Sequence, residues 1–200
     1  MVEDDLDGDA RVGAAQESRE GTLPRGEGPD LVLTNRPNDY HRDHRYTSQL
    51  VLDSAYLLTV PLMCPDVKHL SAMPVFAYWY DSFREGGIFR PHAVVAIDTV
   101  MEVKVEMAVS HASQIFEWLP FNAGTLEQVP ALPEARQQYA RERMERRAHR
   151  VANACLELAP HLVPDGCRFA EAFQISEYGR EPKLEELREL FPLHAAPLGA

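Results

Sequence analysis

The stretch that decides the fold runs Leu31-Val-Leu-Thr-Asn-Arg-Pro-Asn-Asp-Tyr-His-Arg-Asp-His-Arg45. Its beginning, from Asp30 to Asn35, is a short run of mostly apolar residues, which predicts a buried strand. The polar loop that follows contains Pro37, a residue that ends regular structure. Apolar and small side chains then recur on one face from about Asp43 to Thr59, which predicts a helix.

The rest of the chain repeats this alternation of strand and helix. Thr99-Val-Met-Glu102 has the capping-box pattern and predicts the start of a helix that contains His111 and ends at about Glu117. The other predicted elements are strands over Pro74–Tyr80, Ala93–Ile97 and Phe169–Ile175, a long loop over Trp118–Leu132, and helices over Glu134–Leu158 and Pro182–Leu190. This order predicts an α/β fold with a largely parallel sheet flanked by helices.

Residues 1–28 differ in composition from the rest of the chain. They include eight acidic residues, three arginines, six glycines or prolines and no aromatic residue. Too little apolar surface is present there to offset the entropy lost on ordering, so we predict a disordered acidic tail. An acidic docking segment is the functional alternative. The remaining residues, 29–200, are long enough for one domain with its own core.

Composition also bears on partners and compartment. The formal net charge of −11 disfavours binding to a nucleic-acid backbone, and glutamates interspersed with the arginines of residues 134–158 indicate a solvated face. The cysteines, Cys64, Cys155 and Cys167, are odd in number and widely spaced, which argues against a disulfide framework and fits a reducing cytoplasm. We see neither a secretory signal nor an apolar run long enough to span a membrane.

The strongest local feature is Asp39-Tyr-His-Arg-Asp-His44, which follows a predicted strand and opens a helix. Ligands of α/β folds bind beyond the carboxyl ends of the strands, so this segment lies at the expected ligand-binding edge. Histidines three apart lie on nearly the same side of a helical turn. Imidazole is a common zinc ligand, and a carboxylate beside its other nitrogen fixes the ring. A polar surface turn without chemistry remains the alternative.

This stretch resembles the second signature of the PIG-L/LmbE-like N-acetylglucosaminyl deacetylase family (GlcNAc-PI de-N-acetylase-like), a hydrophobic strand followed by H-x-D-H. Later segments are also similar to that family, in the same order: Pro74-Val-Phe-Ala-Tyr-Trp-Tyr80, Ala96-Ile-Asp98 and His111-Ala-Ser-Gln114. The resemblance extends over about residues 29–192. It implies a partial Rossmann-like fold and a zinc-dependent hydrolase that removes the N-acetyl group from an N-acetylglucosamine-type amino sugar or conjugate.

The resemblance also implies roles for individual residues. In the family, two histidines and one aspartate hold one divalent metal, usually zinc, which activates water to attack the N-acetyl group. His44 matches the histidine ligand that the second signature supplies. His41 matches the histidine that stabilises the charged tetrahedral intermediate, and Asp43 matches the carboxylate paired with it. These roles suit amide hydrolysis, which needs a polarised carbonyl, a base and a cation near the oxyanion.

Four further residues are candidate substrate contacts. Arg36 and Tyr40 lie in the loop after the first strand, and Asp81 follows the second strand. His111 has the His-x-Ser-Gln context of the family and is expected to be a wall residue of the site. Packing within a loop explains Arg36 and Tyr40 equally well, and a structural hydrogen bond is the alternative for His111.

The sequence departs from the family at its first signature. That signature, A-H-P-D-D-E, supplies the other histidine ligand, the aspartate ligand and the general base, and no H-P-D-D occurs in the 200 residues. We expect a truncated start rather than an inactive remnant, because the second signature is retained, and we expect the chain as given to lack activity. The rival interpretation is a non-catalytic binding or oligomerisation module. Exposed flanks of its strands would then favour pairing with a second copy.

Overall fold

The structure is a computed structural model that describes residues 28–191 of the chain. The predicted acidic tail, apart from Gly28, therefore lies outside the described residues. The described residues form two compact units: unit 1 is Val94–Ala172, and unit 2 comprises residues 28–93 and 173–191.

Unit 2 contains the parallel strand pair that the sequence predicts. β1 (Leu31–Thr34) and β2 (Val75–Trp79) run parallel, with Leu31 opposite Val75 and Thr34 opposite Tyr78. α1 (Arg42–Leu57) lies between them in the chain. A parallel pair needs such a crossover, so this part of the chain confirms the predicted strand–helix–strand order.

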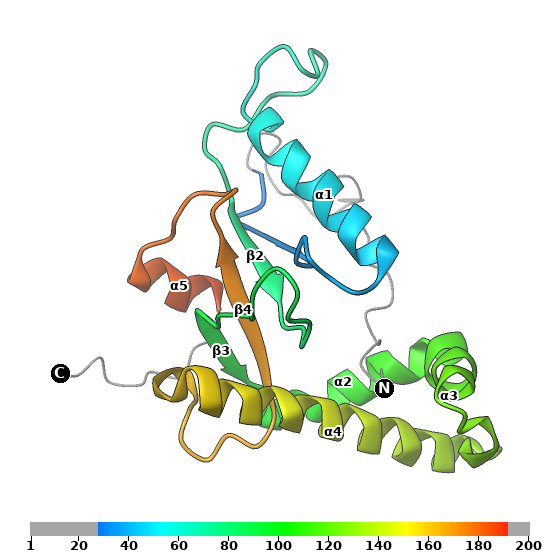
Figure 1. Cartoon of the computed structure of the whole chain (residues 1–200). Coiled ribbons are helices and arrows are strands. Elements are labelled where there is room, and N and C mark those ends of the chain that lie inside the picture. The colour runs from blue at the N-terminus through cyan, green and yellow to red at the C-terminus, as the bar shows by residue number, and fades with distance from the viewer. Residues whose placement is uncertain (1–27, 192–200) are drawn as a thin grey trace. The chain divides into compact units, whose positions relative to one another are not determined.

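The sheet contains both strand directions. Its order is β1-β2-β4-β3, where β3 is Ala93–Ala96 and β4 is Ala170–Ser176. β4 lies beside β2 (Figure 1) and is antiparallel to it, with Ala77 opposite Ile175. The α/β class is confirmed, while β4 departs from the parallel direction of the first pair.

The core of unit 2 fills the space between α1 and the sheet. Leu52 and Ala55 on one face of α1 pack against Phe76 and Tyr78 of β2, and all four are buried. The Tyr78 hydroxyl lies 2.7 Å from the Ser176 hydroxyl, so the phenol has a partner inside this core. α5 (Leu184–Leu190) ends the described part of the unit.

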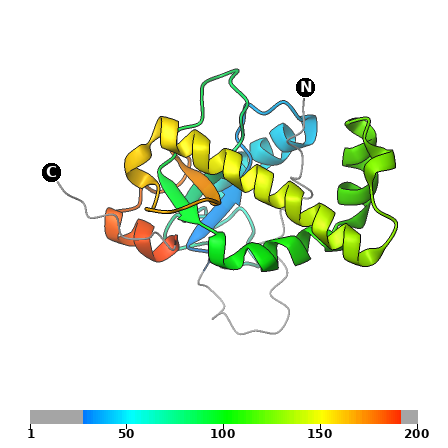
Figure 2. The ribbon, with the colours of Figure 1, turned by 90° about the horizontal axis from the view of Figure 1, so that it is seen from below.

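Unit 1 is built around the longest helix. α4 (Pro133–Leu158) packs against α2 (Met101–Ser110), which precedes it in the chain (Figure 2). The two helices share an apolar core in which several side chains are alanines. Its buried residues include Met101, Val105, Ala108, Ala140, Met144 and Ala148. One short 3₁₀ helix, Pro160–Leu162, follows α4.

The middle of unit 1 differs from the sequence prediction. Thr99 lies inside a 3₁₀ turn, Asp98–Val100, and no side-chain cap hydrogen bond precedes α2, so the predicted capping box is wrong. The predicted continuous helix is also wrong, because α2 ends at Ser110 and His111 is its C-cap.

Short helical turns replace the rest of that helix and the predicted loop. The turns are a π-helix over Gln114–Trp118, α3 over Leu119–Asn122 and a 3₁₀ helix over Leu126–Gln128. The ring of Pro120 would clash with the Phe116 carbonyl in a regular α-helix, which accounts for the widened turn before it. No helix within residues 28–191 is long and apolar enough to cross a membrane.

Candidate functional site

The candidate site is built on the connection from β1 to α1. His41 is the N-cap of α1, and its Nδ1 accepts a hydrogen bond of 3.2 Å from the Asp43 amide. A ring nitrogen that accepts carries no proton, so this contact fits the His41 tautomer with its proton on Nε2. Histidine is rare as an N-cap. Its Nδ1 nevertheless accepts from one of the backbone amides that have no hydrogen-bond partner within the helix at its first turn.

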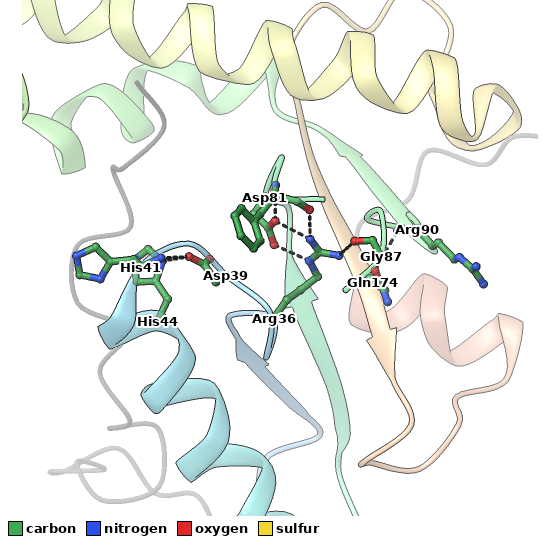
Figure 3. Close-up of polar contacts among 9 residues, drawn as sticks. Arg36, Asp39, His41, His44, Asp81, Gly87, Arg90 and Gln174 are labelled. Carbon is green, nitrogen blue, oxygen red and sulfur yellow. Dashed lines mark hydrogen bonds and ion pairs between the residues drawn. The ribbon is translucent and has the colours of Figure 1, made fainter. Parts of the chain in front are cut away.

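Asp39 is the carboxylate that contacts the histidines (Figure 3). It is buried, one of its oxygens accepts a hydrogen bond of 2.8 Å from the His41 amide, and that same Oδ1 lies 3.1 Å from His44 Nδ1. Burial raises the pKa of the Asp39 carboxyl, but the His44 ring and the His41 amide together hold it below its ordinary value of 3.8. Asp39 is therefore ionised at neutral pH, and its carboxylate lies within ion-pair distance of the His44 ring.

The aromatic rings of this segment pack on one another. The His41 and His44 ring centroids are 4.7 Å apart, which confirms that the two rings lie on one side of the chain. Tyr40 meets both rings edge-on, with centroids 5.8 Å and 6.0 Å away. Its hydroxyl is buried and has no hydrogen-bond partner among the described residues. The Tyr40 hydroxyl is thus available to a group that the structure does not contain.

Asp43 is placed differently from its expected role. Its exposed carboxylate accepts a hydrogen bond of 3.0 Å from Arg42 Nε, and this bond holds the pKa of the Asp43 carboxyl below its usual range. Only its backbone amide contacts the His41 ring. A pairing of the Asp43 carboxylate with His41 stays a prediction. Sequence reasoning did not single out Asp39 as the orienting residue, although an aspartate two residues before His41 is a common turn former.

Arg36 and Asp81 pair with each other (Figure 3). Arg36 Nε lies 2.6 Å from Asp81 Oδ2 and Arg36 Nη2 lies 2.8 Å from Asp81 Oδ1, with both side chains largely buried. The same guanidinium donates to the carbonyls of Gly87, at 3.0 Å, and Phe83, at 2.5 Å. The predicted substrate contacts of Arg36 and Asp81 stay predictions, and their charged groups are already engaged with each other.

His111, the last predicted site residue, belongs to unit 1. It is exposed and its amide donates to the Ala108 carbonyl at 3.0 Å, which ends α2. Arg36, Tyr40, His41, Asp43, His44 and Asp81 all belong to unit 2. The expected wall position of His111 stays a prediction.

The donor set of the described residues does not make a complete zinc site. A catalytic zinc takes three protein ligands and keeps one open position. Within residues 28–191 no group of three or more histidine, cysteine, aspartate or glutamate side chains is arranged to hold a metal ion. The His44 ring, with Asp39 at Nδ1, suits the part of a single ligand, because metal-binding histidines are oriented by a carboxylate in this way.

The arginines of α4 are largely engaged within unit 1. Arg141 pairs with Glu102, and Arg146 lies 3.9 Å from Glu142. The Arg136 guanidinium lies 5.1 Å from the Phe116 ring centroid. Acidic partners within the same unit fit a solvated helix face, and the absence of a nucleic-acid role stays a prediction.

Comparisons with known proteins find likeness only among solved structures. No protein-family model matches the chain, and no curated protein matches it. GalB, the 4-carboxy-2-hydroxymuconate hydratase from Pseudomonas putida KT2440, is similar with 18% identity and a TM-score of 0.45, over 78% of this chain and 54% of that one. The N,N'-diacetylchitobiose deacetylase from Pyrococcus horikoshii is similar with 17% identity and a TM-score of 0.45, over 75% of this chain and 46% of that one.

These likenesses concern the course of the backbone. The chain spans about half the length of each of the two structures, 54% and 46%. One of the two is a deacetylase and the other a hydratase, so the likeness by itself selects neither activity.

Proposed function

We propose that this chain carries the second-signature part of a metal-dependent hydrolase that removes the N-acetyl group from an amino sugar or its conjugate. The observation that carries the proposal is the contact between Asp39 and His44, at 3.1 Å. A carboxylate at Nδ1 places the proton there and turns Nε2 into the donor atom of the ring. His44 would supply that nitrogen to zinc.

His41 is the second functional residue of the proposal. Because its Nδ1 accepts from the Asp43 amide, its proton lies on Nε2, and the Nε2–H group would donate a hydrogen bond to the oxygen of the amide under attack. The role of Asp43 is then to fix this tautomer through its backbone amide. The metal, when bound, would supply a Lewis acid for the carbonyl and lower the pKa of water.

A complete site needs groups beyond those of this chain. His44 is one ligand, whereas a catalytic zinc takes three, and a base is required to accept the proton of water. The family resemblance assigns the other two ligands and the base to an H-P-D-D segment, which these 200 residues do not contain. We therefore propose that the 200 residues alone do not release acetate.

The proposal also covers the substrate contacts, the substrate, the cellular location and the partners of the chain. Tyr40, with its buried hydroxyl, is the substrate contact best supported by its surroundings, ahead of Arg36, Asp81 and His111. We propose an amino-sugar substrate, a cytoplasmic location and no nucleic-acid partner. Pairing of the chain with a second copy is proposed from the strand flanks that the sequence predicts to be open.

A non-catalytic binding or oligomerisation module is the second candidate. The observation that favours it is the lack, within residues 28–191, of any three side chains grouped to hold a metal. Such a module would bind its partner without zinc, and removal of His44 would leave that binding unchanged. The two candidates therefore differ in their dependence on one side chain.

The experiment compares two proteins in an assay of acetate release from N-acetylglucosamine derivatives with added zinc. One is the chain as given, and the other carries a family segment with H-P-D-D joined before Pro29. We expect release only from the joined protein, and we expect His44→Ala to abolish it.

The matched control is His149→Ala, a histidine on α4 in unit 1, which should retain the activity of the joined protein. Zinc-dependent release of acetate by the chain alone would contradict the proposal, and its loss in His44→Ala would show that other residues of this chain complete the metal site. A joined protein that folds and binds zinc but releases no acetate would favour the non-catalytic candidate.

A further inference from the structure

The connection that carries Asp39 is held by a second loop of unit 2. Arg36, just after β1, donates to the Asp81 carboxylate and to the carbonyls of Phe83 and Gly87 (Figure 3). Its guanidinium carbon also lies 5.9 Å from the Phe89 ring centroid. The loops that follow β1 and β2 are therefore fastened to each other at the first residues of both.

Gly86 makes a second, independent contact between these loops. Its φ is +80°, a left-handed conformation that glycine adopts without strain. A Cβ built on Gly86 would lie 2.0 Å from Asn38 Nδ2 and 2.9 Å from Asn38 Cβ. Gly86 thus lies close to the side chain of Asn38, the residue before Asp39, and a side chain at Gly86 would collide with Asn38 as far back as its Cβ.

The far end of the loop after β2 is fastened to β4. The Arg90 amide donates to Gln174 Oε1 at 3.0 Å, and the His92 amide donates to the Phe173 carbonyl at 2.8 Å. The Ile175 amide in turn donates to His92 Nδ1 at 2.9 Å. Since both ends of this loop are anchored, it can act as a fixed support rather than follow the connection it contacts.

On its other side the connection is held by α1. Arg45 Nη1 donates to the Asp39 carbonyl at 2.6 Å and to the Tyr40 carbonyl at 2.8 Å. Arg45 lies in the first turns of α1, so the helix holds the connection at Asp39 and Tyr40, while the loop after β2 contacts it at Arg36 and Asn38. A ligand site needs side chains that surrounding contacts hold in place, and contacts on two sides of the connection provide such support.

We infer that Arg36, Asp81 and Gly86 are positioning residues of the candidate site. By fixing the connection they hold the Asp39 carboxylate against His44 Nδ1, and so they set which nitrogen of His44 is the donor atom. The inference rests on the proposed function only in that it takes His44 Nε2 to be the atom that binds zinc. The geometry itself exists without a metal and can be measured without one.

The inference gives Arg36 and Asp81 a different task from substrate binding. The Arg36 side chain is 8% exposed and already donates to three different residues. Breaking these bonds to reach a ligand would leave a buried carboxylate at Asp81 without its cation, which is costly. A positioning role requires no such exchange.

The test reads the tautomers of the two histidines by long-range ¹H–¹⁵N correlation spectra of the imidazole rings at about pH 8, where neutral rings dominate. Asp39 at Nδ1 predicts the Nδ1–H tautomer for His44, while the Asp43 amide at Nδ1 predicts the Nε2–H tautomer for His41. Spectra of His44→Ala and His41→Asn assign the two signals. No metal is added, so the result is independent of zinc binding.

Three variants probe the support. Gly86→Ala introduces a Cβ that collides with Asn38, and Asp81→Asn weakens the pair with Arg36. Asn38→Ala removes the side chain that contacts Gly86. Because Asn38 is exposed, this third variant carries little risk to folding. We expect each to move the His44 signals away from the Nδ1–H pattern. The matched control is Gly166→Ala, which has a similar φ of +74° but no atom within 4 Å of the added Cβ.

The outcomes separate positioning from general stability. Loss of the His44 pattern in folded Gly86→Ala or Asn38→Ala, with the pattern kept in Gly166→Ala, supports the inference. An unchanged His44 pattern in both Asn38→Ala and Asp81→Asn overturns it, whether or not Gly86→Ala folds. An equal change in Gly166→Ala also overturns it, because φ strain alone would then be the cause.

Discussion

Asp39 Oδ1 and His44 Nδ1 lie 3.1 Å apart. Residues three or four apart are neighbours on a helix, whereas Asp39 and His44 are five residues apart. The contact exists because Asp39 precedes the helix and its carboxylate also accepts the His41 amide. A single buried carboxylate thus contacts both the start of α1 and the ring of the candidate metal ligand.

The first prediction concerns this carboxylate. Asp39→Asn should lower the free energy of unfolding by about 1–3 kcal/mol, because a buried polar group loses charge-assisted partners. Urea unfolding measures the change. Asp43→Asn is the matched control, since its carboxylate is exposed and the substitution should change stability less. Equal effects of the two substitutions would show that burial of Asp39 contributes nothing.

The second prediction concerns the Arg36–Asp81 pair. Removing one partner with Asp81→Ala should destabilise unit 2 by about 3 kcal/mol or more, because the guanidinium remains buried without its carboxylate. Removing both partners should cost less than the sum of the single changes. Glu142→Gln, in an exposed pair of α4 with Arg146 at 3.9 Å, is the control. Additive single and double variants would contradict the coupling.

The third prediction concerns metal binding. In a protein completed with an H-P-D-D segment, His44→Ala should reduce bound zinc strongly, while His41→Asn should retain zinc and lose acetate release. Asparagine is chosen at position 41 because it can still cap α1. Zinc content after dialysis and acetate release are the two measurements. The reverse pattern would show that the two roles are exchanged.

The fourth prediction concerns thiol reactivity. Burial raises the pKa of the Cys155 thiol to about 11, so only about one molecule in a thousand carries its thiolate at pH 8. Cys64 is exposed. Iodoacetamide should modify Cys64 quickly and Cys155 only after unfolding, as mass spectrometry of tryptic peptides would show. Modification of Cys155 in the folded protein at the rate of Cys64 would contradict its buried position.

The fifth prediction concerns pH and His92. Partial desolvation, together with the charge of Arg90, lowers the pKa of the His92 ring below 6.5 in the folded protein. The unfolded state then binds more protons below about pH 6.5, so the stabilising contribution is present above that pH and is lost as pH falls through the folded pKa. His92→Asn should flatten the decline in stability over this range, whereas the control substitution His69→Asn should not.

Much of the fold was predictable because it depends on local patterns. The strands β1 and β2 and the helices α1 and α4 lie within a few residues of the predicted ranges. Apolar runs and one-faced periodicity report burial directly, so such elements are read from sequence. The segment after α2 was not predicted correctly. The helix is interrupted there by the turn at His111 and by Pro120, which periodicity does not report.

The site was predictable as a segment but not as a set of contacts. The proximity of His41 and His44 follows from their spacing and is confirmed at 4.7 Å between ring centroids. The pairing of Arg36 with Asp81 joins residues far apart in the chain, and no local pattern encodes such a contact. The orienting role of Asp39 depends on a turn before the helix, where helical spacing does not apply.

His41 serves two purposes, since the same ring caps α1 and is proposed to act on the substrate. Serine, aspartate and asparagine cap helices at least as well as histidine, so mutation to any of them would leave the helix start intact. A lineage that lost the chemistry at this position would therefore keep a well-folded, soluble descendant. Catalysis and folding can therefore be separated by a substitution at this one position.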